Sequence, residues 1–101
     1  MPAPKKLTPK QRAKLKALAN PISQRHLLGK ADPDEGFLHS VDVALEAHEL
    51  VKVGLLQNCA ASPEEVCATL ERALGASRVQ IIGRVIVLYR RSAKNPRIEL
   101  D

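Results

Sequence analysis

The run Val85-Ile86-Val87-Leu88 constrains the fold most, because it is apolar at four consecutive positions. A strand with one face in water alternates apolar and polar residues, whereas an uninterrupted apolar run is typical of a strand covered on both faces. The pair Gly83-Arg84 separates this run from a second β-prone segment, which is the spacing of a tight hairpin. The sequence therefore predicts an antiparallel hairpin of residues 78–82 and 85–89, with the second strand central in a sheet.

Three segments carry the pattern of a helix start. Thr8-Pro9-Lys10-Gln11, Asp32-Pro33-Asp34-Glu35 and Ser62-Pro63-Glu64-Glu65 each place a capping side chain before a proline and a Gln or Glu three residues after the cap. The first helix should end near Asn20, before Pro21, and the third at Gly75. Apolar residues at helical spacing mark the inward faces of the second and third helices: Phe37, Leu38, Val41, Ala44, Leu45 and His48 in the second, and Val66, Cys67, Leu70 and Leu74 in the third.

Strands at residues 24–28 and 50–56 complete the order helix, strand, helix, strand, helix, strand, strand. Helical connections between successive strands favour parallel pairing, and the final pair is an antiparallel hairpin. The expected fold class is α/β, an αβαβαββ sandwich of two or three layers with a mixed four-stranded sheet. We expect one domain, residues 1–91, and a loose polar tail, residues 92–101, in which Ile98 and Leu100 could add a short edge strand.

Charge is distributed unevenly along the chain. Residues 1–30 hold eight Lys or Arg and no acid, residues 31–77 hold nine Asp or Glu against two cations, and residues 78–101 hold six cations against two acids. If the fold brings the two ends together, the surface has a basic face and an acidic back, which is typical of a protein that binds a polyanion. The simpler alternative is a basic tail that serves only solubility.

The sequence indicates no catalytic or metal chemistry. Cys59 and Cys67 lack further ligands at zinc spacing, and we expect them to be reduced and structural in a cytoplasmic protein. His48 falls on an apolar helix face and suggests a structural role, His39 falls on the opposite face, and His26 could contact a phosphate. We expect no enzyme activity, no cofactor, no small-molecule substrate and no membrane segment.

The segment from Gly29 to Asp32 joins a strand end to a helix start, where backbone N–H groups can hold a phosphate. Gly29 would allow close approach and Lys30 would supply a cation, although a simple turn would have the same sequence. Lys52 alternates with apolar neighbours and could equally be a structural lysine. Because the chain has one Phe, one Tyr and no Trp, binding should depend on phosphates and RNA shape more than on base stacking. The candidate contact residues are Lys10, Lys14, Arg25, Gly29, Lys30, Lys52, Arg84, Arg90 and Arg91.

The chain resembles the YhbY/CRM (chloroplast RNA splicing and ribosome maturation) domain family over about residues 7–91. The most specific matches are His48-Glu49-Leu50-Val51-Lys52-Val53 and the segment from Ile82-Gly83-Arg84 to Leu88-Tyr89-Arg90. The other matching segments occur in the same order: residues 7–12, 15–19, 27–30, 34–36, 44–47 and 75–76.

The resemblance implies a fold similar to the C-terminal domain of translation initiation factor 3 and RNA binding through a Gly-x-x-Gly loop with surrounding cations. It also implies that a single-copy bacterial member acts on precursors of the large ribosomal subunit, so that the partners would be ribosomal RNA and the pre-ribosomal particle. Asp32 stands where the family has the second glycine of the loop, and its negative charge there would disfavour a bound phosphate, so the flanking cations could bear more of the binding.

Two alternatives remain at this point. The acidic middle, especially Asp42, Glu46 and Glu49, could dock a basic ribosomal protein. The domain could also be a regulatory binder of other structured RNA.

Overall fold

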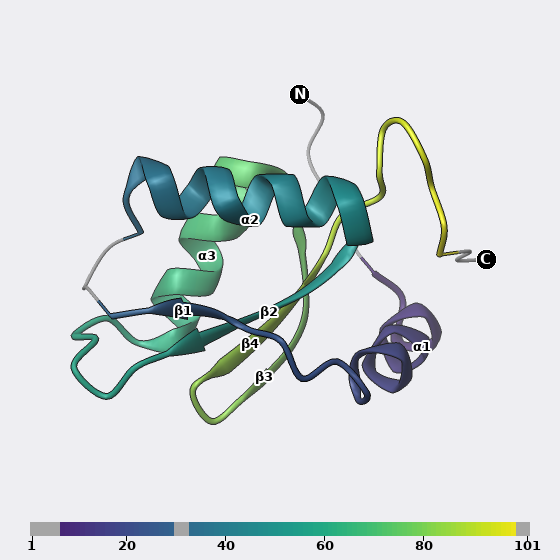
Figure 1. Ribbon diagram of the computed structural model, residues 1–101. Coiled ribbons are helices and arrows are strands. Elements are labelled where there is room, and N and C mark those ends of the chain that lie inside the picture. The colour runs from purple at the N-terminus through teal and green to yellow at the C-terminus, as the bar shows by residue number, and fades with distance from the viewer. Residues whose placement is uncertain (1–6, 30–32, 99–101) are drawn as a thin grey trace.

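The computed structural model describes residues 7–29 and 33–98 (Figure 1). The predicted order of helices and strands is confirmed, and the predicted ends of most elements differ from the observed ones by one or two residues. The elements are α1 (Pro9–Ala19), β1 (His26–Leu28), α2 (Glu35–His48), β2 (Leu50–Leu55), α3 (Pro63–Leu74), β3 (Ser77–Ile82) and β4 (Val85–Tyr89).

The four strands form one mixed sheet in the order β1-β2-β4-β3. β1 pairs with β2 in parallel, and β4 is antiparallel to both β2 and β3. The predicted parallel pairing of β2 with β3 is therefore wrong, because β4 lies between them. This position gives β4, the most continuously apolar strand, a strand neighbour on each side.

Helices cover both faces of the sheet, so the sandwich has three layers. α2 and α3 pack on one face and α1 packs on the other (Figure 1). The side chains of β4 confirm that this strand is central: Ile86 and Leu88 belong to the core under α2 and α3, whereas Val87 and Tyr89 belong to the core under α1. We call these the α2/α3 face and the α1 face of the sheet.

Two of the three predicted helix caps are confirmed. Thr8 and Gln11 form a reciprocal capping box at α1, and the Ser62 hydroxyl accepts from the backbone N–H of Glu65 at α3. α2 begins at Glu35, two residues later than predicted, and its cap is Asp34, whose Oδ1 accepts from Phe37 N at 2.8 Å. Asp32, the predicted cap, lies outside the described residues.

The inward stripe of α2 also differs from the prediction near its end. Val41 and Leu45 are buried, and the next residue of this four-residue spacing is Glu49, which is also fully buried. His48 is therefore turned away from the core and is exposed, contrary to its predicted place on the apolar face. His39 is exposed as expected.

Residues 92–98 lie against the domain instead of being loose. Ser92 is buried, and Ile98 packs against the core under α1. No strand forms in this segment as far as Ile98, and Leu100 lies outside the described residues.

Candidate nucleic-acid interface

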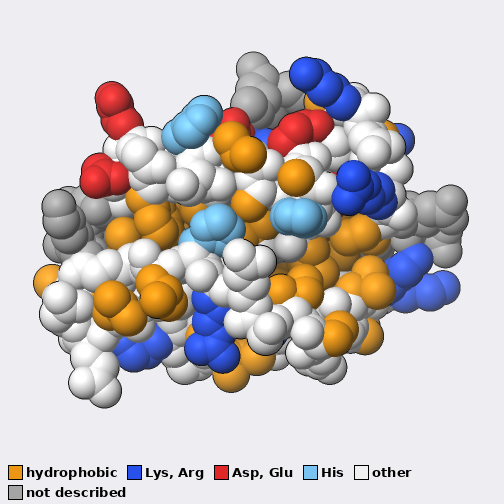
Figure 2. All heavy atoms as spheres, in the orientation of Figure 1, with side chains coloured by type: hydrophobic (Ala, Val, Ile, Leu, Met, Phe, Trp, Pro, Cys, Tyr) orange, Lys and Arg blue, Asp and Glu red, His pale blue; other side chains and the backbone are white. Residues whose placement is uncertain are grey.

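Within residues 7–29 and 33–98, acidic side chains are confined to one side of the molecule. Every Asp and Glu of the described residues belongs to α2 or α3 or caps α2: Asp34, Glu35, Asp42, Glu46, Glu49, Glu64, Glu65 and Glu71. Both helices cover the same face of the sheet. Figure 2 shows acidic side chains over α2 at the top of the view, and Lys and Arg mainly to the right and along the lower edge.

The α1 face carries cations and, among the described residues, no acid. α1 contributes Lys10, Arg12, Lys14 and Lys16. Lys52 points to the same face, because it pairs with Val87 in the sheet and Val87 packs under α1. The Arg25 side chain also lies on this face, beside Gly54 of β2.

The fold brings the two basic ends of the chain together only in part, because α1 lies apart from the exit of β1 and the final hairpin. The loop after β1 and the hairpin turn lie at the same end of the sheet, since Leu28 pairs with Leu55 and Leu55 N donates to Arg84 O. α1 packs toward the other end, over a core that includes Leu50 and Tyr89 (Figure 1). Lys52 and Arg25 lie between these two ends, so the cations follow the length of the α1 face.

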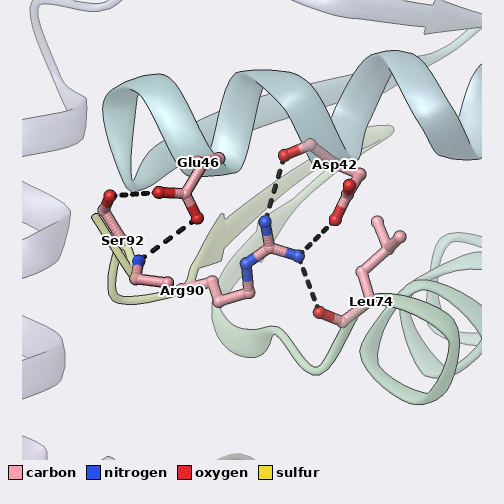
Figure 3. A network of polar contacts seen from close by, with 6 residues as sticks. Asp42, Glu46, Leu74, Arg90 and Ser92 are labelled. Carbon is pink, nitrogen blue, oxygen red and sulfur yellow. Dashed lines mark hydrogen bonds and ion pairs between the residues drawn. The ribbon is translucent and has the colours of Figure 1, made fainter. Parts of the chain in front are cut away.

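Two of the predicted contact arginines have partners within the chain. Arg90 forms an ion pair with Asp42 at 2.6 Å and also donates to the carbonyl oxygens of Leu74 and Asp42 (Figure 3). Arg84 donates to the carbonyl oxygens of Leu55, Leu56 and Cys59 and so ties the loop between β2 and α3 to the hairpin. Arg90 is thus a structural link between α2, α3 and β4, and Arg84 combines a structural role with an exposed position.

Lys52 is also anchored. Its Nζ donates to the carbonyl oxygen of Ile22 at 2.7 Å, which fixes the segment between α1 and β1 against β2. The side chain is half-buried and lies on the α1 face. The remaining predicted cations in the described residues, Lys10, Lys14, Arg25 and Arg91, are all exposed.

The acidic residues proposed as a docking site for a basic protein are engaged inside the domain. Asp42 pairs with Arg90, and Glu46 accepts from the Ser92 hydroxyl (Figure 3). Glu46 also accepts from the backbone N–H groups of Ala93 and Lys94. These hydrogen bonds, led by that of Ser92, lower the pKa of Glu46. None of these carboxylates is left unpaired for a partner.

Glu49 has a role that the sequence pattern did not reveal. Its carboxylate accepts from the backbone N–H groups of Ser92, Arg97 and Ile98 at 2.6–2.8 Å. Burial alone would raise the pKa of Glu49, but these hydrogen bonds outweigh it and lower the pKa. The available signal was an acid at a helix C-terminus, where the helix dipole disfavours negative charge unless another group compensates.

An open pocket lies beside the β1 exit. It is lined by Leu27, Leu28, Gly29, Asp34, Gly36, Phe37, Ser40 and Asn58. The N-terminus of α2 reaches this pocket, but Asp34 already accepts one of its N–H groups and adds a negative charge. Gly29 is half-buried here, and Lys30 lies outside the described residues. The helix N-terminus is therefore a poor phosphate site, whatever Asp32 contributes.

The described residues contain neither a group of side chains suited to a metal ion nor a helix long and apolar enough to cross a membrane. Cys59 and Cys67 are both buried and form no disulfide with each other, as expected. Burial, together with the nearby Glu71, raises the pKa of Cys67 to about 12, so that its thiol stays protonated.

The family model of the CRS1/YhbY (CRM) domain matches residues 7–90, which is nearly the whole described chain. The chain belongs to the CRS1/YhbY (CRM) domain family. This CRM domain is 37% identical over 94 residues to the Bacillus subtilis "Probable RNA-binding protein YqeI", a match that covers 93% of this chain and 98% of that protein. It is 35% identical over 86 residues to a Haemophilus influenzae protein named "RNA-binding protein", with 85% and 87% of the two chains covered.

A solved structure supports the same fold for the CRM domain. The solution structure of the Staphylococcus aureus protein SAV1595, which is described there in terms of RNA binding, superposes with a TM-score of 0.78 at 40% identity. The match covers 94% of this chain and 99% of that one. The expected family and fold class are thereby confirmed, and the resemblance to initiation factor 3 stays a prediction.

Proposed function

We propose that this CRM domain binds ribosomal RNA in precursors of the large ribosomal subunit and acts there as an assembly factor. RNA binding is supported by the family and by the names of the relatives. The observation that carries the choice of surface is the separation of charge: cations lie along the α1 face, and every described acid lies in or at the ends of α2 and α3. A phosphate backbone is attracted to the first surface and repelled by the second.

The proposed contact residues fall into two groups. Lys10, Lys14, Arg25 and Arg91 are exposed cations, and Gly29 lies at the β1 exit. Lys52 and Arg84 serve the fold as well, because each donates to a backbone carbonyl oxygen. Arg90 is assigned to the fold through its ion pair with Asp42. The domain extends beyond the expected boundary at residue 91 and includes at least residues 92–98, because these residues pack onto it.

Crosslinking in cells followed by sequencing of the bound RNA tests the ribosomal role. We expect enrichment of large-subunit ribosomal RNA over messenger and transfer RNA. Enrichment of a messenger or transfer RNA would instead support a regulatory RNA-binding domain. Association with large-subunit precursors that survives RNase treatment would support a protein partner, although the carboxylates that the sequence suggested for that role are engaged internally.

The family's loop supplies a separate prediction. Replacing Asp32 with glycine removes a negative charge from the segment after Gly29, so RNA affinity should stay unchanged or rise. A filter-binding titration of the variant against the wild-type protein measures this. A clear loss of affinity would show that Asp32 itself contributes to binding.

A further inference from the structure

An apolar row crosses the whole sheet at the end farthest from α1. Leu27 of β1 pairs with Gly54 of β2, Gly54 pairs with Val85 of β4, and Val85 pairs with Ile82 of β3. Paired residues of neighbouring strands point to the same face of a sheet. All four positions therefore lie on the α1 face, and we call them the transverse row.

The transverse row is largely uncovered by the described residues. Leu27 is 59% exposed and Ile82 is 57% exposed, although both lie within strands. α1 packs over Leu50, Val79, Val87 and Tyr89 at the other end of the same face and does not reach the row. Contiguous exposed apolar residues on a sheet are typical of an interaction surface.

Gly54 has no side chain, so nothing projects from the sheet at this position of the row. A Cβ atom at this position would lie 3.2 Å from Leu27 Cδ2 and 3.5 Å from Arg25 Cδ. The side chains of Leu27 and Arg25 therefore lie across β2 at Gly54, and the aliphatic stem of the arginine extends the apolar surface. The transverse row therefore continues across β2 through the side chains of its neighbours, with the cationic residue Arg25 beside it.

The charges around the transverse row indicate what kind of partner fits it. Arg25 and Lys52 lie on the same face, and Arg84 lies in the hairpin turn between Ile82 and Val85. The described residues place no acid on this face. A partner that matches the row must combine negative charge with flat apolar surfaces. RNA offers this combination where its bases are unpaired, because a duplex hides the base faces by stacking.

We propose that the transverse row binds unpaired bases of the RNA, while the neighbouring cations bind its phosphates. This inference rests on the proposed RNA-binding function and adds a specific preference to it, for loops and bulges over uninterrupted duplex. The contact is aliphatic, which suits a chain that has a single Phe and a single Tyr. Aliphatic contact removes apolar area from water but displaces no counterions, so it should be insensitive to salt.

Binding titrations at several salt concentrations separate the row from the cations. The probes are an RNA hairpin with a single-stranded loop and a blunt RNA duplex of the same number of nucleotides. For the double variant Leu27→Ala with Ile82→Ala we expect about tenfold weaker binding of the hairpin, with the same slope of log affinity against log salt. Binding of the duplex should be unchanged. Val43→Ala is the matched control, because Val43 is similarly exposed but lies on α2.

The outcomes distinguish this inference from the function on which it rests. If the wild-type protein binds the hairpin and the double variant binds it equally well, the proposed role of the row is wrong, while the proposed RNA-binding function still holds. An equal loss on hairpin and duplex would also overturn it, and thermal unfolding of the variant shows whether such a loss reflects folding. Failure of the wild-type protein to bind either RNA would overturn both proposals. A dimer in sedimentation that the double variant dissociates, with RNA affinity unchanged, would assign the row to a second copy of the chain.

Discussion

Replacing Glu49 with alanine lowers the free energy of unfolding by about 3 kcal/mol. The Glu49 carboxylate is buried and accepts from the backbone N–H groups of Ser92, Arg97 and Ile98. Its removal leaves these donors without their partner and releases the segment that carries Ile98 onto the core under α1. Urea denaturation followed by circular dichroism measures the change.

The backbone at Glu49, the C-cap of α2, is strained. Glu49 has φ 66°, a left-handed conformation that costs energy in a residue other than glycine. The chain accepts this cost at a position where the carboxylate reaches the C-terminal segment. Glu49→Gln should lose less stability than Glu49→Ala, because one amide oxygen can still accept from Arg97 and Ile98 while the amide nitrogen faces the Ser92 donor.

The stability difference between the wild type and Glu49→Gln should depend on pH. The pKa of Glu49 is lowered in the folded state, so the charged carboxylate contributes stability above the ordinary pKa of a glutamate. That contribution is lost as the pH falls through the lowered, folded-state value. We expect the two proteins to differ most near neutral pH and to converge in acid.

Glu64→Ala is the control for Glu49, because Glu64 is exposed on α3, whereas the carboxylates that accept from residues 92–98 in the described chain are Glu46 and Glu49. It should change stability by less than about 1 kcal/mol. Equal stability of Glu49→Ala and the wild type would show that the C-terminal segment contributes nothing to the fold.

Replacing Lys10, Lys14 and Arg25 together with alanine should weaken RNA binding by about two orders of magnitude at low salt. All three side chains are exposed on the acid-free side of the molecule. For each phosphate that is no longer neutralised, the slope of log affinity against log salt should fall by about 0.7 to 0.9, for a total reduction of roughly 2 to 3. Filter binding at a series of salt concentrations measures both quantities.

Arg72 provides the control for these cations, because it is exposed on α3, on the acidic side. Arg72→Ala removes the same charge as Arg25→Ala and should leave the salt slope unchanged. If Arg72→Ala and Arg25→Ala weaken binding equally, net charge rather than the α1 face determines affinity, and the proposed interface is wrong.

Local sequence signals predicted most of the fold. Caps, prolines and the uninterrupted run at Val85 determine where helices and strands form, and these features act over a few residues. The insertion of β4 between β2 and β3 was not predictable in the same way, because a helical connection is compatible with adjacent or separated parallel strands. At α2, two aspartates on either side of Pro33 both suit the cap position, and the local pattern does not decide between them.

The candidate site was predictable in its charge but not in its geometry. The distribution of acids and cations along the chain predicted a basic and an acidic side, and the α1 face supports that interpretation. The structural role of an arginine depends on partners that lie far away in the sequence. Arg90 pairs with Asp42, and Arg84 donates to the carbonyl oxygen of Leu56. The transverse row depends on register across four strands, which no local pattern specifies.

The most direct test of the proposed interface is an NMR titration of the isotopically labelled protein with RNA, following every backbone amide. We predict that the signals that shift belong to α1, to residues 25–29, to Lys52–Gly54 and to the hairpin around Gly83. The exposed sides of α2 and α3 should be unaffected. Shifts concentrated on α2 and α3, with α1 and β1 unchanged, would contradict the assignment of RNA binding to the α1 face.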